Sequence, residues 1–178
     1  MRLRSSLLFF IGKAILFLIA ISIVWHFISP AYNDLLAGTA NLFHPTHTKI
    51  ISYGQDTLRV YLSGSFKAIY EIYGLDLQYG LLIVLALIAA TPGLRLMKRF
   101  KFILIAFIIM FLIHVASMLV FAKVASSAKP TTISSNPFVV FFCIIGPDLF
   151  PALVWMAMAF RQFFPKPESN DAKPQQQT

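Results

Sequence analysis

Four stretches of this sequence are apolar and long enough to be considered for crossing a bilayer. They are Leu7 to Ile28, Leu77 to Thr91, Phe102 to Ala122 and Pro137 to Phe160. A spanning helix needs about 20 apolar residues for a hydrocarbon core of about 30 Å, so the second stretch suffices only if it continues past Pro92 and Gly93 to Met97. Hydrophobic residues make up 58% of the 178 residues and charged residues 12%. The sequence therefore predicts an all-α integral membrane protein with four transmembrane helices.

The basic residues indicate how such helices would be oriented. The net charge is +8, but the basic side chains do not form the continuous stripe that a nucleic-acid site requires, so we expect no nucleic-acid partner. They gather instead at the ends of the apolar stretches, at Arg2 and Arg4, from Arg95 to Lys101, and at Arg161, Lys166 and Lys173. Loops rich in Lys and Arg stay in the cytoplasm. Both termini are therefore expected to be cytoplasmic.

A soluble insert, residues 29–76, separates the first two apolar stretches. A short amphipathic helix on the membrane surface is expected from Ser29 to Pro45. Three segments rich in Ile, Val, Tyr and Thr then follow, at Lys49 to Tyr53, Thr57 to Leu62 and Phe66 to Tyr73, with turn residues between them. This pattern predicts a small extracytoplasmic antiparallel β meander of two or three strands. Two strands alone are marginal in water, so the meander must lean on the helices or on a partner.

The tyrosines of this insert have a second interpretation. Tyr53, Tyr61, Tyr70 and Tyr73, together with Trp25, could form only the aromatic belt that is usual at a membrane interface. The sequence divides into a membrane domain over residues 1–164, which includes the insert, and a tail over residues 165–178. The tail lacks apolar residues to bury and is predicted to be disordered and cytoplasmic.

Two ionisable residues are predicted to lie near the middle of the membrane, His114 and Asp148. A charge at that depth costs at least a few kcal/mol, so an ionisable residue there is a candidate for function. Gly146, Pro147 and Pro151 surround Asp148 and predict a kink or break in the fourth helix, because proline removes a helical hydrogen bond. We interpret His114 and Asp148 as a polar pair that joins two helices. A proton relay through the same pair is the alternative.

Other reactive side chains give weaker indications. Cys143 with His114 could suggest an intramembrane thiol enzyme, but a thiol in apolar surroundings is inert. His44 and His47 are closely spaced, yet no third ligand for a metal is identifiable. Phosphate loops, serine nucleophile motifs and paired glutamates are not evident in the sequence. We therefore expect no enzyme, no metal and no cofactor.

Three segments carry a resemblance to a known family. They run from Trp25 to Leu36, from Tyr79 to Leu82 and from Gly146 to Trp155, and they resemble the small membrane proteins called exosortase-associated. The resemblance implies a bacterial inner-membrane protein that assists an envelope protein-sorting system. Exosortases use an intramembrane Cys with Arg and His, but the sequence around Cys143 is not that motif, so the resemblance implies no active site.

The sequence thus predicts a non-enzymatic inner-membrane accessory or scaffold protein. Its expected partners are the lipid bilayer and either another membrane protein or a second copy of the chain. The alternative function is a proton-coupled carrier or channel component that uses His114 and Asp148.

Overall fold

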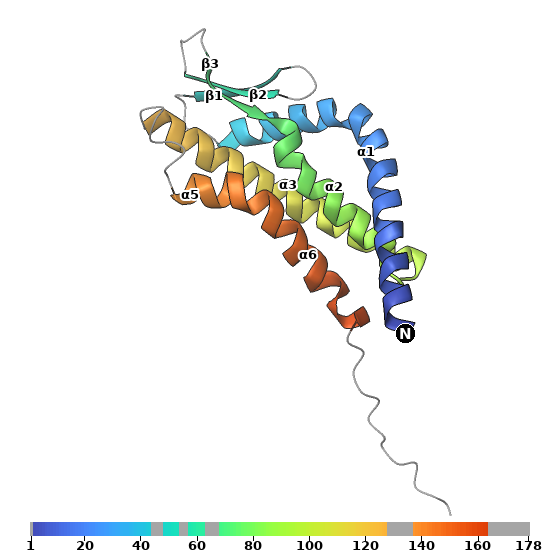
Figure 1. Cartoon of the computed structure of the whole chain (residues 1–178). Helices are drawn as coiled ribbons and strands as arrows, with labels where there is room; N and C mark the ends of the chain where they lie inside the picture. The colour runs from blue at the N-terminus through green and yellow to red at the C-terminus, as the bar shows by residue number, and fades with distance from the viewer. Residues whose placement is uncertain (1, 44–47, 54–56, 63–67, 128–136, 164–178) are drawn as a thin grey trace, which may run out of the picture.

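The computed structural model describes residues 2–43, 48–53, 57–62, 68–127 and 137–163. Most of them are helical, as predicted. The elements in chain order are α1 (Arg2–Phe43), β1 (Thr48–Tyr53), β2 (Thr57–Leu62), β3 (Ala68–Tyr73), α2 (Gly74–Ala90), α3 (Leu96–Ser127), α5 (Pro137–Val139), the π-helix η1 (Val140–Ile145) and α6 (Gly146–Phe163). Figure 1 shows the sheet at one end of a bundle formed by α1, α2, α3 and α6. The predicted disordered tail and the predicted helix end at Pro45 lie outside the described residues.

Two helices are long and apolar enough to cross a membrane. The qualifying segments are Leu7–Phe43 of α1 and Leu96–Val124 of α3. The apolar parts of α2 and α6, Gln78–Ala90 and Asp148–Ala159, are shorter. At 1.5 Å per residue they extend over roughly 20 Å, less than a hydrocarbon core of about 30 Å. By length and composition, α1 and α3 are therefore the two candidate membrane-spanning helices among the described residues.

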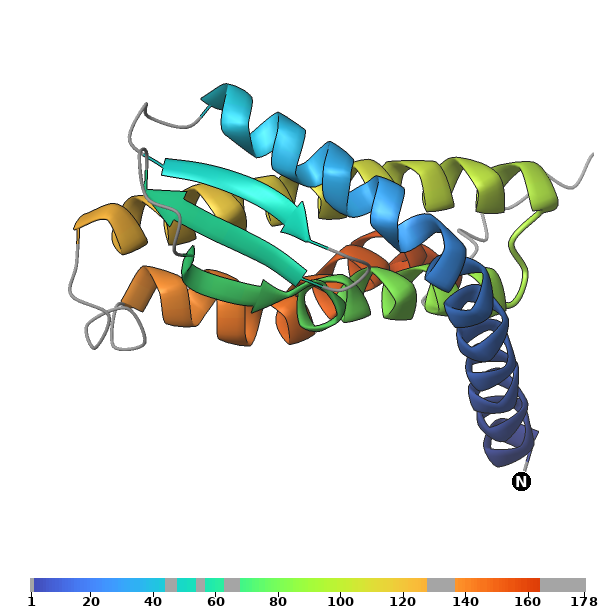
Figure 2. The same cartoon turned by 90° about the horizontal axis from the view of Figure 1, so that it is seen from above.

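α1 is one continuous helix, where the sequence predicted a membrane helix followed by a separate surface helix. Pro30 lies inside it and cannot donate the hydrogen bond that would reach the carbonyl of His26. The hydroxyl of Ser29 approaches this carbonyl instead, at 3.5 Å. Such substitution by a Ser or Thr hydroxyl lets a membrane helix continue through proline. α1 bends in its middle, so its two halves run in different directions (Figures 1 and 2).

The three strands form the predicted antiparallel sheet, in the order β1-β2-β3. Its inner face presents Ile50, Leu58 and Val60, which are almost completely buried in the same hydrophobic core as the helices. β1 runs beside the C-terminal half of α1 (Figure 2). There the side-chain amide of Asn41 bonds both backbone groups of Ile50, donating to the carbonyl at 2.7 Å and accepting from the N–H at 2.9 Å. The sheet is therefore anchored to the helices.

α2 does not extend past Pro92, which corrects the longer second crossing considered from the sequence. The helix ends at Ala90, and the chain turns at Pro92 and Gly93 before α3 begins. Gly93 has a φ of 75°, a left-handed conformation that glycine adopts without strain. Proline just beyond a helix end is common because it cannot continue the helix.

The fourth apolar stretch remains helical but changes its hydrogen-bonding pattern. Val140–Ile145 form the π-helix η1, and the N–H of Gly146 donates to the carbonyl of Phe141, five residues earlier. A Cβ on Gly146 would lie 2.6 Å from the ring of Phe150 and 2.9 Å from the carbonyl of Phe141. A larger residue at position 146 would therefore clash with these groups. The widened turns fall immediately before Pro147, where the sequence predicted an irregularity.

Candidate functional site

A group of buried polar side chains joins α1 to α2 near the sheet. The indole N–H of Trp25 donates to the side-chain oxygen of Gln78 at 2.7 Å. The amide nitrogen of Gln78 in turn donates to the side-chain oxygen of Asn33 at 2.5 Å. All three residues are at most 5% exposed. Buried polar groups are costly unless they are hydrogen-bonded, and here they satisfy one another. Trp25 is thus part of the core and not of an interfacial aromatic belt.

A second buried contact joins α1 to α3. The hydroxyl of Tyr32 and Nδ1 of His114 are joined by a hydrogen bond of 2.6 Å. The ring of Tyr32 also makes T-shaped contacts with the rings of Phe107 and Phe111, with ring centroids 5.8 and 5.7 Å apart. His114 is 1% exposed. Its other ring nitrogen, Nε2, has no hydrogen-bond partner among the described residues.

The structure does not join His114 to Asp148 by a hydrogen bond. His114 has Tyr32 as its polar partner, and Asp148 lies exposed in the first turn of α6. Pro151 is buried inside α6. The side chains of Cys143 and Pro147 lie outside the described part of the chain.

Another polar cluster lies at the opposite end of the bundle from the sheet, where α2 ends and α3 begins. We call this the basic end because Arg95, Lys98, Arg99 and Lys101 lie there. The guanidinium of Arg99 donates to the carbonyl of Thr91 at 3.1 Å, and the indole N–H of Trp155 donates to the hydroxyl of Thr91 at 3.2 Å. The ring of Trp155 also stacks on that of Phe10 in α1, with the ring centroids 6.1 Å apart. Residues from α1, α3 and α6 thus meet the turn that follows α2 in this cluster.

The outer face of the sheet presents a charged and aromatic surface. The guanidinium of Arg59 forms an ion pair with Glu71 on the neighbouring strand, at 2.7 Å, and lies 3.9 Å from the ring centroid of Tyr53. Desolvation lowers the pKa of Arg59, but the hydrogen bond with Tyr61 and the charge of Glu71 outweigh it, so the pKa is raised above its ordinary value. Tyr53 is 58% exposed and Ile51 is 38% exposed. We call Ile51, Tyr53, Arg59, Tyr61 and Glu71 the outer sheet surface.

Sequence reasoning did not identify Tyr32, Asn33 or Gln78 as interior polar residues. One signal was present on α1. Trp25, Ser29, Tyr32, Asn33 and Leu36 recur at spacings of three and four residues, which places them on one face of a helix. That face is buried in the structure. The signal was obscured because the sequence predicted two separate helices on either side of Pro30.

Metal chemistry finds no support in the described residues. No group of three His, Cys, Asp or Glu side chains comes together among them in a way that could hold an ion. His44 and His47, the pair considered from the sequence, lie outside the described residues.

We compared the chain with known proteins at the level of family, sequence and structure. The chain matches no protein-family model, no curated protein and no solved structure.

Proposed function

We propose that this protein is a non-enzymatic accessory or scaffold of the bacterial inner membrane that binds a partner through its outer sheet surface. The observation that carries this proposal is the arrangement of Arg59, Glu71 and Tyr53 on a sheet fastened to membrane helices. Tyr and Arg are enriched among the few residues that carry most of the binding energy at protein interfaces. The ion pair and the stacked guanidinium fix these side chains in advance, which lowers the entropy lost on binding.

The nature of the buried polar groups agrees with a structural role for the helices. Trp25, Gln78 and Asn33 are joined by two hydrogen bonds, so these buried polar side chains have one another as partners. Transmembrane hydrogen bonds contribute only about 0.6 kcal/mol each on average. Several of them spread over three helices fix which faces meet, and that rigidity suits a scaffold.

We further propose that the partner belongs to an exosortase-type sorting system. The segments that resemble exosortase-associated proteins contain Trp25 and Asn33 on α1 and Trp155 on α6, and these residues tie the helices together. The resemblance therefore covers residues that determine how the bundle packs. The segments that carry the resemblance do not include the outer sheet surface. The residues of that surface would therefore be able to differ between such proteins, and each protein would bind its own partner.

The proposed topology has four helices in the membrane, with the basic end in the cytoplasm. Supporting it, α1, α2, α3 and α6 share one hydrophobic core, and α1 begins and α6 ends at the same end of the bundle as the basic turn between α2 and α3 (Figure 1). Basic residues of this kind favour the cytoplasmic side. Reporter fusions at Thr178 and near Ser65 should report opposite compartments. Equal signals from both fusions would contradict the proposed topology.

Site-specific photocrosslinking tests the binding surface. A photoreactive residue replaces Tyr53 on the outer sheet surface in one variant, and Asp34, an exposed residue of α1, in a control. Irradiation of native membranes should give a discrete protein adduct from position 53 and none from position 34. An adduct of twice the 20.0 kDa mass of the chain would identify a second copy as the partner. Failure to form any protein adduct at position 53 would contradict the proposal.

A proton-coupled carrier remains the second candidate, because one specific observation favours it. Nε2 of His114 is buried without a hydrogen-bond partner among the described residues while Nδ1 bonds Tyr32, an arrangement in which a ring could accept and release protons. Vesicles that contain the purified protein and a pH dye test this function. Proton flux that is lost in His114→Gln and kept in Asp148→Asn would support a carrier based on His114 and Tyr32.

A further inference from the structure

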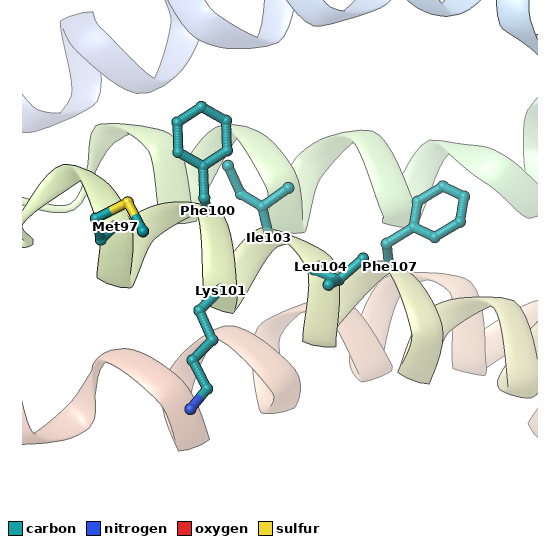
Figure 3. Close-up of a pocket in the computed structure, with 6 residues that line it drawn as sticks. All are labelled: Met97, Phe100, Lys101, Ile103, Leu104 and Phe107. Atoms are coloured by element: carbon teal, nitrogen blue, oxygen red, sulfur yellow. The ribbon is translucent and has the colours of Figure 1, made fainter.

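The first three turns of α3 line an open groove of about 530 Å³ at the basic end. Its walls are formed by the side chains of Met97, Phe100, Ile103, Leu104 and Phe107, and Lys101 is the charged residue among the described residues that line it. Figure 3 shows Phe100, Ile103 and Phe107 projecting to one side of α3, while the ammonium of Lys101 extends toward the other side.

The shape and chemistry of the groove fit one part of a lipid. From Met97 to Phe107 it follows about 15 Å of helix, comparable with a large part of an acyl chain. Its lining is apolar except for Lys101, so a chain of methylene groups would contact only carbon and sulfur atoms along most of its length. Phe100 and Leu104 are each more than 60% exposed, and a lipid would cover them.

The charge at this end of the bundle is not balanced by the described acidic residues. Arg95, Lys98, Arg99 and Lys101 gather here. The described acidic residues, Asp34, Glu71, Asp76 and Asp148, lie on segments nearer the sheet: the C-terminal half of α1, strand β3 and the first turns of α2 and α6. Arg99 is occupied by the carbonyl of Thr91. Lys101 is the lining residue whose ammonium can meet an anionic headgroup.

We propose that this groove binds an anionic phospholipid, with one acyl chain against Phe100, Leu104 and Phe107 and the phosphate at Lys101. Clusters of Lys and Arg at the cytoplasmic end of a membrane helix attract anionic lipid headgroups, and the proposed topology puts the basic end on that side. Bound there, the lipid would fill the space beside the first turns of α3 and fix the depth of the basic end in the bilayer. The site goes beyond the accessory function and rests only on the proposed topology, in which the basic end faces the cytoplasm.

Native mass spectrometry of the full-length protein tests the site, with an equimolar mixture of phosphatidylglycerol and phosphatidylcholine as the probe. The parent protein should retain phosphatidylglycerol preferentially. Lys101→Gln should lower this preference about fivefold, the loss expected when one basic residue near an anionic lipid is removed. Lys98→Gln removes the same charge from the same helix but does not line the groove, and it should change the preference by less than twofold.

A second variant separates the groove from general attraction between charges. Leu104→Trp keeps every charge and places a larger side chain in the groove, so it should reduce the retention of both lipids. Because Leu104 is 61% exposed, this variant should fold, and a thermal melt checks that it does. Equal effects of Lys98→Gln and Lys101→Gln together with unchanged retention by Leu104→Trp would overturn the proposal, as would the absence of a preference in the parent protein.

Discussion

The hydroxyl of Tyr32 on α1 lies 2.6 Å from Nδ1 of His114 on α3, and both side chains are buried. This contact joins two helices through residues that are 82 positions apart in the sequence. It lies on the same face of α1 as Trp25 and Asn33, which bond Gln78 of α2. One face of α1 therefore makes polar contacts with two other helices.

Replacing Tyr32 by Phe should destabilise the protein by about 1–2 kcal/mol. The ring packing is kept, but Nδ1 of the buried His114 loses its partner, and an unsatisfied buried polar group costs about this much. Tyr79→Phe is the matched control, because Tyr79 is 52% exposed, and it should have almost no effect. Reversible unfolding in mixed micelles provides the free energies. Equal stability of the two variants would show that the Tyr32 contact contributes nothing.

Replacing Asn41 by Ala should loosen the sheet from the helices. The change leaves the N–H and carbonyl of Ile50 without the side-chain partner that bonds both, at a cost of about 1–3 kcal/mol. Hydrogen exchange at the amide of Ile50 should become faster, while exchange in α3 should stay slow. Truncation of the adjacent Leu42, which is 82% exposed, should leave the exchange of Ile50 unchanged. Faster exchange in both variants would argue against the anchoring role of Asn41.

Gly146→Ala should destabilise the protein by about 1–3 kcal/mol, the usual cost of overpacking. Its new methyl group would overlap the ring of Phe150 and the carbonyl of Phe141. Gly12→Ala is the control, since nothing lies within 4 Å of a Cβ at that position, and alanine is the better helix former. We expect the control to be as stable as the parent or slightly more stable. Thermal unfolding of the two variants side by side measures the difference.

Replacing Arg99 by Gln should destabilise the basic end by about 1 kcal/mol. The guanidinium donates to the carbonyl of Thr91 at the end of α2, where a cation also interacts favourably with the helix dipole. Lys98→Gln on the neighbouring exposed position should cost much less. A comparison of unfolding free energies at low and high salt adds a further check, because the partly buried contact of Arg99 should be the less sensitive to salt.

Local patterns were sufficient to predict the strands. Alternating β-branched and aromatic residues, interrupted by Gly54-Gln55-Asp56 and Ser63-Gly64-Ser65, gave β2 with its observed bounds and β1 to within one residue. Whether a segment forms a strand or a turn is decided largely by residues that are close together in the sequence, so both could be predicted. The end of α2 at Pro92 and Gly93 depends on the same kind of signal, although the sequence interpretation let the helix continue in order to reach the length of a crossing.

The contacts between helices could not be predicted in the same way. The sequence indicated a face on α1, but which helix meets that face depends on the packing of the whole bundle. His114 was therefore matched with Asp148 by depth alone, whereas the structure matches it with Tyr32. Pro30 was interpreted as a helix boundary because the hydroxyl of Ser29, which compensates for the missing hydrogen bond, acts only once the helix is formed.

Quantitative co-purification tests the accessory function most directly. The parent protein, Arg59→Ala and Lys98→Ala, a change at an exposed lysine of the basic end, are crosslinked in native membranes and isolated at equal yield, and the membrane proteins recovered with each are quantified. We expect a specific protein to be recovered with the parent and with the exposed-lysine control, and at least fivefold less of it with Arg59→Ala. Recovery of no specific protein with the parent, or equal recovery with all three, would contradict binding through the outer sheet surface.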